Sequence, residues 1–125
     1  MIFDHVSLAI RDYARSKRFY SAALAPLGIV LVKEFDQWAG FGRDGAPQFW
    51  FGIGGEPQLP LHIAFAADSR AQVRDFHAAA LAAGGRDNGG PGIRAQYHPN
   101  YYGAFVIDPD GHNIEAVCHR PEPQP

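Results

Sequence analysis

Cysteine is almost absent from this sequence, since Cys118 is the only one among 125 residues. A single cysteine excludes a disulfide within the chain and is typical of proteins in a reducing compartment. No uninterrupted apolar run reaches the ~18 residues that a membrane-spanning helix needs. The start of the sequence also lacks the basic and then apolar pattern of a secretory signal. These absences predict a cytoplasmic protein that does not enter a membrane.

The sequence also lacks an excess of charge of either sign. Eleven Lys and Arg residues against thirteen Asp and Glu residues give a formal net charge of −2 and a pI near 6.3. This balance gives no electrostatic reason to bind nucleic acid. The hydrophobic fraction of 46% predicts a globular protein that can bury a core in one domain. Three prolines in residues 119–125 predict a disordered tail.

The most informative feature that the sequence does contain is an internal repeat. Residues 5–28, HVSLAIRDYARSKRFYSAALAPLG, align without a gap on residues 62–85, HIAFAADSRAQVRDFHAAALAAGG. The identical pairs include His5/His62, Phe19/Phe76, Leu24/Leu81 and Gly28/Gly85. Because the two histidines occupy the same place in a duplicated unit, we expect them to face one shared site.

Each half of the sequence predicts a strand, a helix and three further strands. In the first half the strands are expected at 2–10, 29–35, 37–43 and 48–53, with a helix that Asp12 caps and Gly28 ends. In the second half they are expected at 61–67, 94–97, 104–108 and 113–118. Ser69 and Gln72 predict a capping box, and the glycine-rich residues 86–92 a loop. We therefore expect one domain over 1–118: a first module of about 1–53, a linker at 54–60 and a second module of about 61–118.

The alternation within the two leading strands predicts which face holds the histidines. Small side chains such as Ser7 and Ala64 share a face with His5 and His62, whereas apolar side chains occupy the opposite face. Helices are expected to cover the apolar face. A concave space is thereby left in front of both imidazoles, which is typical of a ligand site.

A third candidate ligand lies in the motif DPDGHNIE at 108–115. This motif places Glu115 inside a strand that is otherwise apolar, where an unpaired carboxylate is costly. A metal would be a suitable partner, because two imidazoles and one carboxylate can fill one face of an octahedron and leave positions for water or substrate. We therefore predict that His5, His62 and Glu115 bind one divalent metal ion, for which Zn, Fe, Mn, Ni and Co are all suitable.

Three segments together, DHVSLAI at 4–10, LHIAF at 61–65 and DPDGHNIE at 108–115, resemble the vicinal oxygen chelate superfamily. This superfamily includes glyoxalase I, fosfomycin- and bleomycin-resistance proteins and extradiol dioxygenases. The resemblance implies an α+β fold in which two βαβββ modules pair into a cupped, barrel-like mixed sheet. It implies metal ligands at His5, His62 and Glu115, and a small oxygenated substrate on which the metal acts as a Lewis acid. It also implies a homodimer whose sites are often built between subunits.

Departures from the superfamily leave the function open. Glyoxalase I has a fourth ligand, a glutamate, in the last strand of its first module. An alignment of the turns at 44–45 and 110–111 places Phe49 there, with Trp50 beside it and Gln48 close by. The tyrosine that precedes the carboxylate in extradiol dioxygenases corresponds to Phe105. The candidates are thus a glyoxalase-like lyase or isomerase, an Fe(II) extradiol-type dioxygenase, and a non-catalytic protein that binds a small molecule.

Other candidate site residues come from the segment 97–102, YHPNYY. His98 has an unperturbed pKa of ~6.5 and is the candidate general acid or base. Tyr101 and Tyr102 are candidate hydrogen-bond donors to a substrate oxyanion, and the same three residues could equally serve in packing and turns. We expect Gln48, Trp50 and Arg94 to line the substrate pocket.

Overall fold

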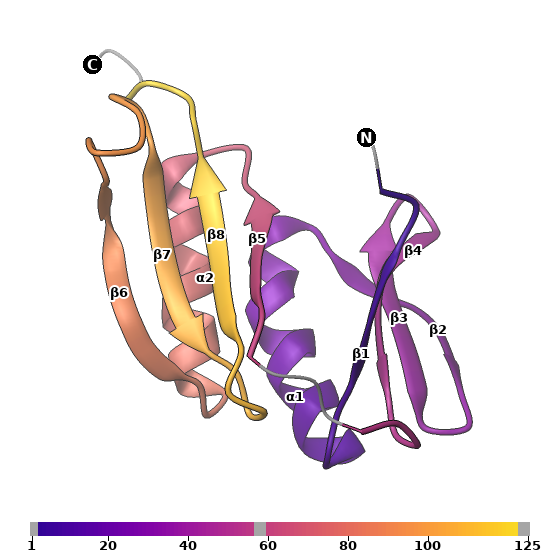
Figure 1. Cartoon of the computed structure of the whole chain (residues 1–125). Coiled ribbons are helices and arrows are strands. Elements are labelled where there is room, and N and C mark those ends of the chain that lie inside the picture. The colour runs from indigo at the N-terminus through magenta and orange to yellow at the C-terminus, as the bar shows by residue number, and fades with distance from the viewer. Residues whose placement is uncertain (1–2, 57–59, 123–125) are drawn as a thin grey trace.

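The computed structural model describes residues 3–56 and 60–122 and consists of two modules (Figure 1). The first contains β1 (Val6–Ala9), α1 (Tyr13–Leu24), the short 3₁₀ helix η1 (Ala25–Leu27), β2 (Val30–Phe35), β3 (Trp38–Arg43) and β4 (Ala46–Gly52). The second contains β5 (His62–Ala66), α2 (Arg70–Ala82), β6 (Arg86–Ile93), β7 (Tyr102–Ile107) and β8 (Asn113–Cys118). Residue 2 of the first predicted strand, residues 57–59 of the predicted linker and residues 123–125 of the predicted tail lie outside the described residues.

Each module forms its own four-stranded mixed sheet. The strand orders are β1-β4-β3-β2 and β5-β8-β7-β6, and the two orders are equivalent position by position. The leading strand pairs parallel with the last strand in each module, and the other pairs are antiparallel. Figure 1 shows two curved sheets that do not close into a barrel. These findings confirm the α+β class with two βαβββ modules.

The predicted helix ends are confirmed. The Asp12 side chain accepts a hydrogen bond from the Arg15 amide, and Gly28 has a left-handed φ of 75° after η1. Ser69 Oγ accepts from the Gln72 amide, while the Gln72 side chain accepts from the Asp68 amide rather than from that of Ser69. Neither α-helix in the described part of the chain is long and apolar enough to cross a membrane.

The core lies on the helix-facing sides of the two sheets. Tyr20 of α1 is fully buried, and its ring contacts Phe49 and Phe51 of β4 at centroid distances of 4.9 and 5.2 Å. In the second module the buried side chains of α2 include Val73 and Phe76. The two helices also contact each other. Figure 1 shows α1 between the two sheets. The faces of the sheets that carry the candidate site residues are therefore directed away from the helical layer.

The segment at 86–97 differs from the prediction. Residues 86–93 form strand β6 rather than a loop, and residues 94–97 enter a turn rather than a strand. Glycines disfavour strands, which is why the sequence indicated a loop. Here the pairing of β6 with β7 outweighs that preference, with two register shifts around Gly89. Arg94 stabilises this edge strand by donating to the carbonyl oxygens of Gly90 and Gly92.

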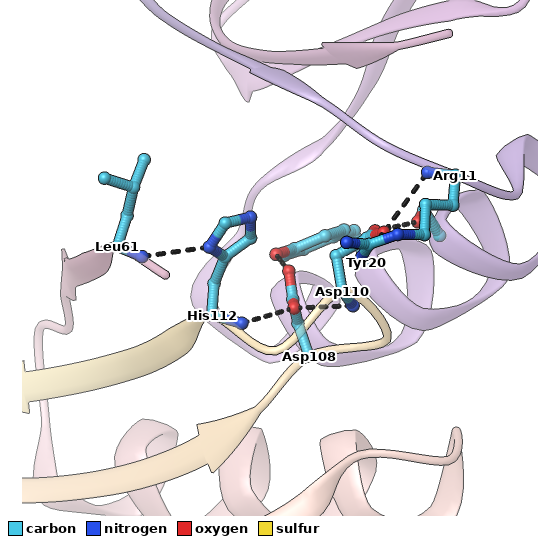
Figure 2. Close-up of polar contacts among 7 residues, drawn as sticks. Arg11, Tyr20, Leu61, Asp108, Asp110 and His112 are labelled. Carbon is cyan, nitrogen blue, oxygen red and sulfur yellow. Dashed lines mark hydrogen bonds and ion pairs between the residues drawn. The ribbon is translucent and has the colours of Figure 1, made fainter. Parts of the chain in front are cut away.

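The DPDGH part of the motif at 108–115 joins the two modules (Figure 2). The buried Asp108 carboxylate accepts a hydrogen bond from the Tyr20 hydroxyl and two more from the amides of Asp110 and His112. His112 is buried as well, and its Nδ1 accepts from the Leu61 amide at 3.0 Å. Asp110 accepts from the Arg11 side chain. The motif thereby fixes α1, the start of β5 and the start of β8 relative to one another.

Candidate metal and substrate site

The centre of the candidate site is Glu115 on β8, whose side chain is 0% exposed. Parallel pairing of β5 with β8 places Ala64 opposite Glu115 and His62 opposite Asn113, so that His62 and Glu115 share one face of the sheet. His62 Nε2 and Glu115 Oε1 share a hydrogen bond of 2.7 Å. The buried carboxylate thus has the partner that its position in an apolar strand requires.

Tyr101 occupies the other oxygen of the same carboxylate. Its hydroxyl donates to Glu115 Oε2. Burial, and then the hydrogen bond to Glu115, raise the pKa of Tyr101 to about 12. Tyr101 therefore keeps its proton throughout the physiological pH range. The superfamily resemblance places Phe105 at the position of the tyrosine that extradiol dioxygenases carry, whereas in the structure Tyr101 lies beside the carboxylate.

Gly103 permits the contact between Tyr101 and Glu115. A Cβ atom at Gly103 would lie 3.1 Å from Glu115 Oε2 and 3.2 Å from a ring carbon of Tyr101. Gly103 was not among the residues predicted from the sequence, although the alternation along 103–105 places it on the same face as Phe105. A side chain at this position would therefore require the carboxylate or the phenol to shift by a few tenths of an ångström.

We expect Gly103→Ala to lower the pKa of Tyr101 from about 12 toward its ordinary value of 10.0. Glu115 is fully buried, so the half-exposed Tyr101 ring is the group that moves, and it loses the carboxylate that holds its proton. A pH titration of tyrosine ring signals by carbon NMR measures this shift. Gly90→Ala is the matched control, since a Cβ there meets no atom within 4 Å. An unchanged Tyr101 pKa in Gly103→Ala would contradict the assignment.

An aromatic and cationic wall borders the His62–Glu115 pair. The Phe105 ring lies 6.0 Å from the His62 ring, and the Arg94 guanidinium lies over Phe105 at 5.3 Å from its centroid. Phe105 is also the cross-strand neighbour of Glu115. Arg94 thus lies near the site as a positive charge, which is where a substrate carboxylate or other anionic group would be stabilised.

His5 is not brought to this pair within the chain. Its Nδ1 lies 2.6 Å from Asp4 Oδ1, and its side chain is 54% exposed. In residues 3–56 and 60–122, no three His, Cys, Asp or Glu side chains converge as a metal site. His5, His62 and Gln48 nevertheless border the same cavity of about 520 Å³ between the modules. The single chain therefore assembles two of the three predicted ligands.

The remaining predicted residues lie in different places. Tyr102 is on the opposite face of β7, where Arg74 donates to its hydroxyl and Arg70 lies 5.1 Å from its ring. It contacts α2 and does not join Tyr101 at Glu115. His98 is exposed, and its Nδ1 accepts from the Asn100 amide. His119, which no sequence signal indicated, connects His98 to the site, because the His119 ring contacts both His98 and Tyr101.

The strand register corrects the residue that corresponds to Glu115 in the first module. Ser7 pairs with Trp50, as Ala64 pairs with Glu115, so Trp50 and not Phe49 is the equivalent residue. A bulge between β3 and β4 causes the difference. Phe41 pairs with Phe49 but Gly42 pairs with Pro47, so Gln48 is one extra residue on β4. Aligning the turns at 44–45 and 110–111 does not account for this extra residue, and it therefore placed Phe49 instead of Trp50 opposite Glu115.

The comparisons with known proteins agree with the fold. The profile of the Glyoxalase/Bleomycin resistance protein/Dioxygenase superfamily matches residues 2–116. A glyoxalase/bleomycin resistance protein from Albidiferax ferrireducens T118 is 32% identical, with a TM-score of 0.84 over 94% of this chain and 99% of that one. A glyoxalase-related enzyme from Fulvimarina pelagi is 19% identical, with a TM-score of 0.71 over 94% of this chain and 87% of that one.

The structure named oxidase ChaP-H1 is 22% identical, with a TM-score of 0.68 over 97% of each chain. Among curated proteins, no sequence matches the chain. The profile match spans nearly all of the two modules, and the Albidiferax structure matches in sequence as well as in fold. The chain therefore belongs to the Glyoxalase/Bleomycin resistance protein/Dioxygenase superfamily.

Proposed function

We propose that the protein is a metal-dependent enzyme of the glyoxalase type, a lyase or isomerase that acts on a small oxygenated substrate. The observation that carries this proposal is the fully buried Glu115 carboxylate, which His62 and Tyr101 contact on its two oxygens. An imidazole and a carboxylate on one sheet face are suitable donors for a divalent ion. When bound, the metal would act as a Lewis acid on a substrate carbonyl or on paired oxygens.

The third ligand in this proposal is His5 of the partner subunit. Within one chain His62 and Glu115 stand without a third His, Cys, Asp or Glu among the described residues. His5 is exposed, and the His62 side chain is 53% exposed. A homodimer that places the first module of one copy over the second module of the other would bring the three together. Such a site is shared between subunits in the isologous manner of a two-fold dimer.

The chain's own residues have distinct tasks in this proposal. Tyr101 fixes the Glu115 carboxylate as a neutral donor, with a pKa raised to about 12. Because a phenol has a single proton, Tyr101 would have to turn away from Glu115 to donate to a substrate oxygen. Arg94 supplies positive charge beside Phe105. His98 lies at the exposed end of the same cluster, through His119, and is the candidate for moving a proton to or from solvent.

A second candidate is an Fe(II) extradiol-type dioxygenase, which the position of Tyr101 favours. The superfamily resemblance assigns that chemistry a tyrosine near the carboxylate, and Tyr101 meets the description from a turn rather than from Phe105. The metal's identity separates the two candidates. Iron, with loss of activity on air oxidation, would favour the dioxygenase, whereas zinc, nickel or manganese would favour a lyase or isomerase.

Metal analysis of protein purified without chelator tests the proposal directly. We expect close to one equivalent of metal per chain in the parent and little in His62→Ala, because the variant loses a ligand. His77→Ala is the control, since His77 on α2 bonds to Asp87 and lies outside the site. If the parent and His62→Ala are equally empty and neither takes up added Zn²⁺ or Fe²⁺, the proposal fails. A non-catalytic small-molecule binder would then be the better description.

A further inference from the structure

The open face of the first module carries two tryptophans. Strand pairing places Trp50 beside Ser7. It places Trp38 beside Gly52, which in turn pairs with Ala9. Both indoles therefore lie on the face of the sheet that carries Ser7 and Ala9. Both are half-buried, although within residues 3–56 and 60–122 no helix covers this side of the sheet (Figure 1). Phe35 extends the same surface, since its ring meets Trp50 edge-on at 6.2 Å. We call Trp38, Trp50 and Phe35 the indole floor.

Two glycines keep the indoles flat against the sheet. A Cβ at Gly40 would lie 2.8 Å from ring atoms of Trp50, and a Cβ at Gly52 would lie 2.0 Å from the ring of Trp38. Glycine in a strand interior is unfavourable for folding and often marks a close approach. Because each ring rests directly on backbone, one broad π face of each ring is turned outward from the sheet.

The indole floor occupies the place in the first module that the His62–Glu115 pair occupies in the second module. Trp50 is the equivalent of Glu115, and Gly40, which pairs with Trp50, is the equivalent of Phe105. The duplication has thus produced an ionisable half and an aromatic half. In the proposed homodimer these two halves face each other, so the floor lies opposite the His62–Glu115 pair of the partner. Lys33 places a cation 5.9 Å from the Phe35 ring at the margin of the floor.

We propose that the indole floor binds a planar, conjugated ring of the substrate, whose adjacent oxygen atoms reach the metal ligands. This inference rests on the proposed function and names its substrate class as aromatic or quinone-like compounds with neighbouring oxygens. Offset stacking on an indole requires a flat partner. A short aliphatic oxo compound would reach the metal but leave both indoles uncovered.

Intrinsic fluorescence provides the test, because Trp38 and Trp50 are the only two tryptophans of the chain. We would titrate the metal-loaded protein with lawsone, a planar hydroxynaphthoquinone with adjacent oxygens, and with pyruvate, which has adjacent oxygens but no ring. Lawsone is expected to quench the emission saturably, whereas pyruvate leaves it unchanged. Free N-acetyltryptophanamide controls for collisional quenching and light absorption by lawsone.

Trp50→Leu and Trp38→Leu locate the binding site. Each removes one stacking surface, so we expect lawsone to bind about 3- to 10-fold more weakly to each variant. Neither tryptophan is a metal ligand, so the metal content should stay that of the parent. If the parent protein has normal metal content but lawsone quenches it no differently from the free amide, the indole floor does not bind the ring. The proposed function would remain intact in that case. Saturable lawsone binding by a protein that takes up no metal would overturn the proposed function instead.

Discussion

Two variants that each fail to bind metal should recover binding when their chains are mixed. His5→Ala and Glu115→Gln are each expected to purify nearly empty, because each lacks one ligand. In a mixed dimer, one site combines both defects and the other combines the intact His5 with the intact Glu115. If random exchange makes about half of the dimers mixed, about a quarter of the parent's metal content should return. Elemental analysis after co-expression measures this recovery.

The matched control is a mixture of His62→Ala with Glu115→Gln. Both substitutions lie in the second module, so every site of that mixed dimer lacks one ligand and the mixture should stay empty. Recovery in this control would show that the ligands of one site come from both second modules. Failure of the first mixture to recover, with mixed dimers present by native mass spectrometry, would contradict the shared site.

Asp108→Ala should be among the most destabilising single substitutions in the chain. Asp108 is buried and accepts from the Tyr20 hydroxyl and from the amides of Asp110 and His112. Burial, and then the neighbouring Asp108 carboxylate, hold the pKa of Tyr20 well above its ordinary value, so Tyr20 remains a neutral donor. Loss of the carboxylate leaves three donors without their acceptor, two of them buried and the Asp110 amide partly buried, which predicts a decrease of about 3–5 kcal/mol in the free energy of unfolding.

Chemical denaturation of Asp108→Ala and Tyr20→Phe measures the difference. Tyr20→Phe removes one donor but leaves the carboxylate with both amides, so a decrease of about 1–2 kcal/mol is expected. Equal denaturation midpoints for the two variants would contradict the role of Asp108 as the shared acceptor. A second readout is the metal content at low denaturant, because the same network fixes Leu61, which immediately precedes His62.

Local signals in the sequence predicted most of the fold. The caps at Asp12 and Ser69 and the left-handed stop at Gly28 depend on residues within one or two turns of a helix. The pairing of His62 with Glu115 was also predictable, because the repeat and the DPDGHNIE motif place both on strands of one module. Edge strand β6 was not, because its glycines gain their strand conformation only from β7.

The parts of the site that could not be predicted depend on register and on the relation between modules. Tyr101 reaches Glu115 only because the turn after Arg94 directs it there, with Arg94 and Tyr101 joined through the backbone. The equivalence of Trp50 with Glu115 depends on the bulge at Gln48, which is visible only in the pairing of β3 with β4. His5 shares a repeat position with His62, but a repeat says nothing about whether the two meet within one chain.

The bond between Tyr20 and Asp108 also has a consequence for the time at which the protein can finish folding during synthesis. The two residues are 88 positions apart, and Asp108 belongs to the last hairpin of the second module. At 5–20 residues per second, a ribosome needs roughly 4 to 18 s to add the intervening residues. During that interval the Tyr20 hydroxyl must remain bonded to water, and α1 cannot dock against α2 until α2 itself has emerged. The first half of the chain is therefore expected to wait in an incompletely packed state, and to reach its final structure only when the last strands leave the ribosome.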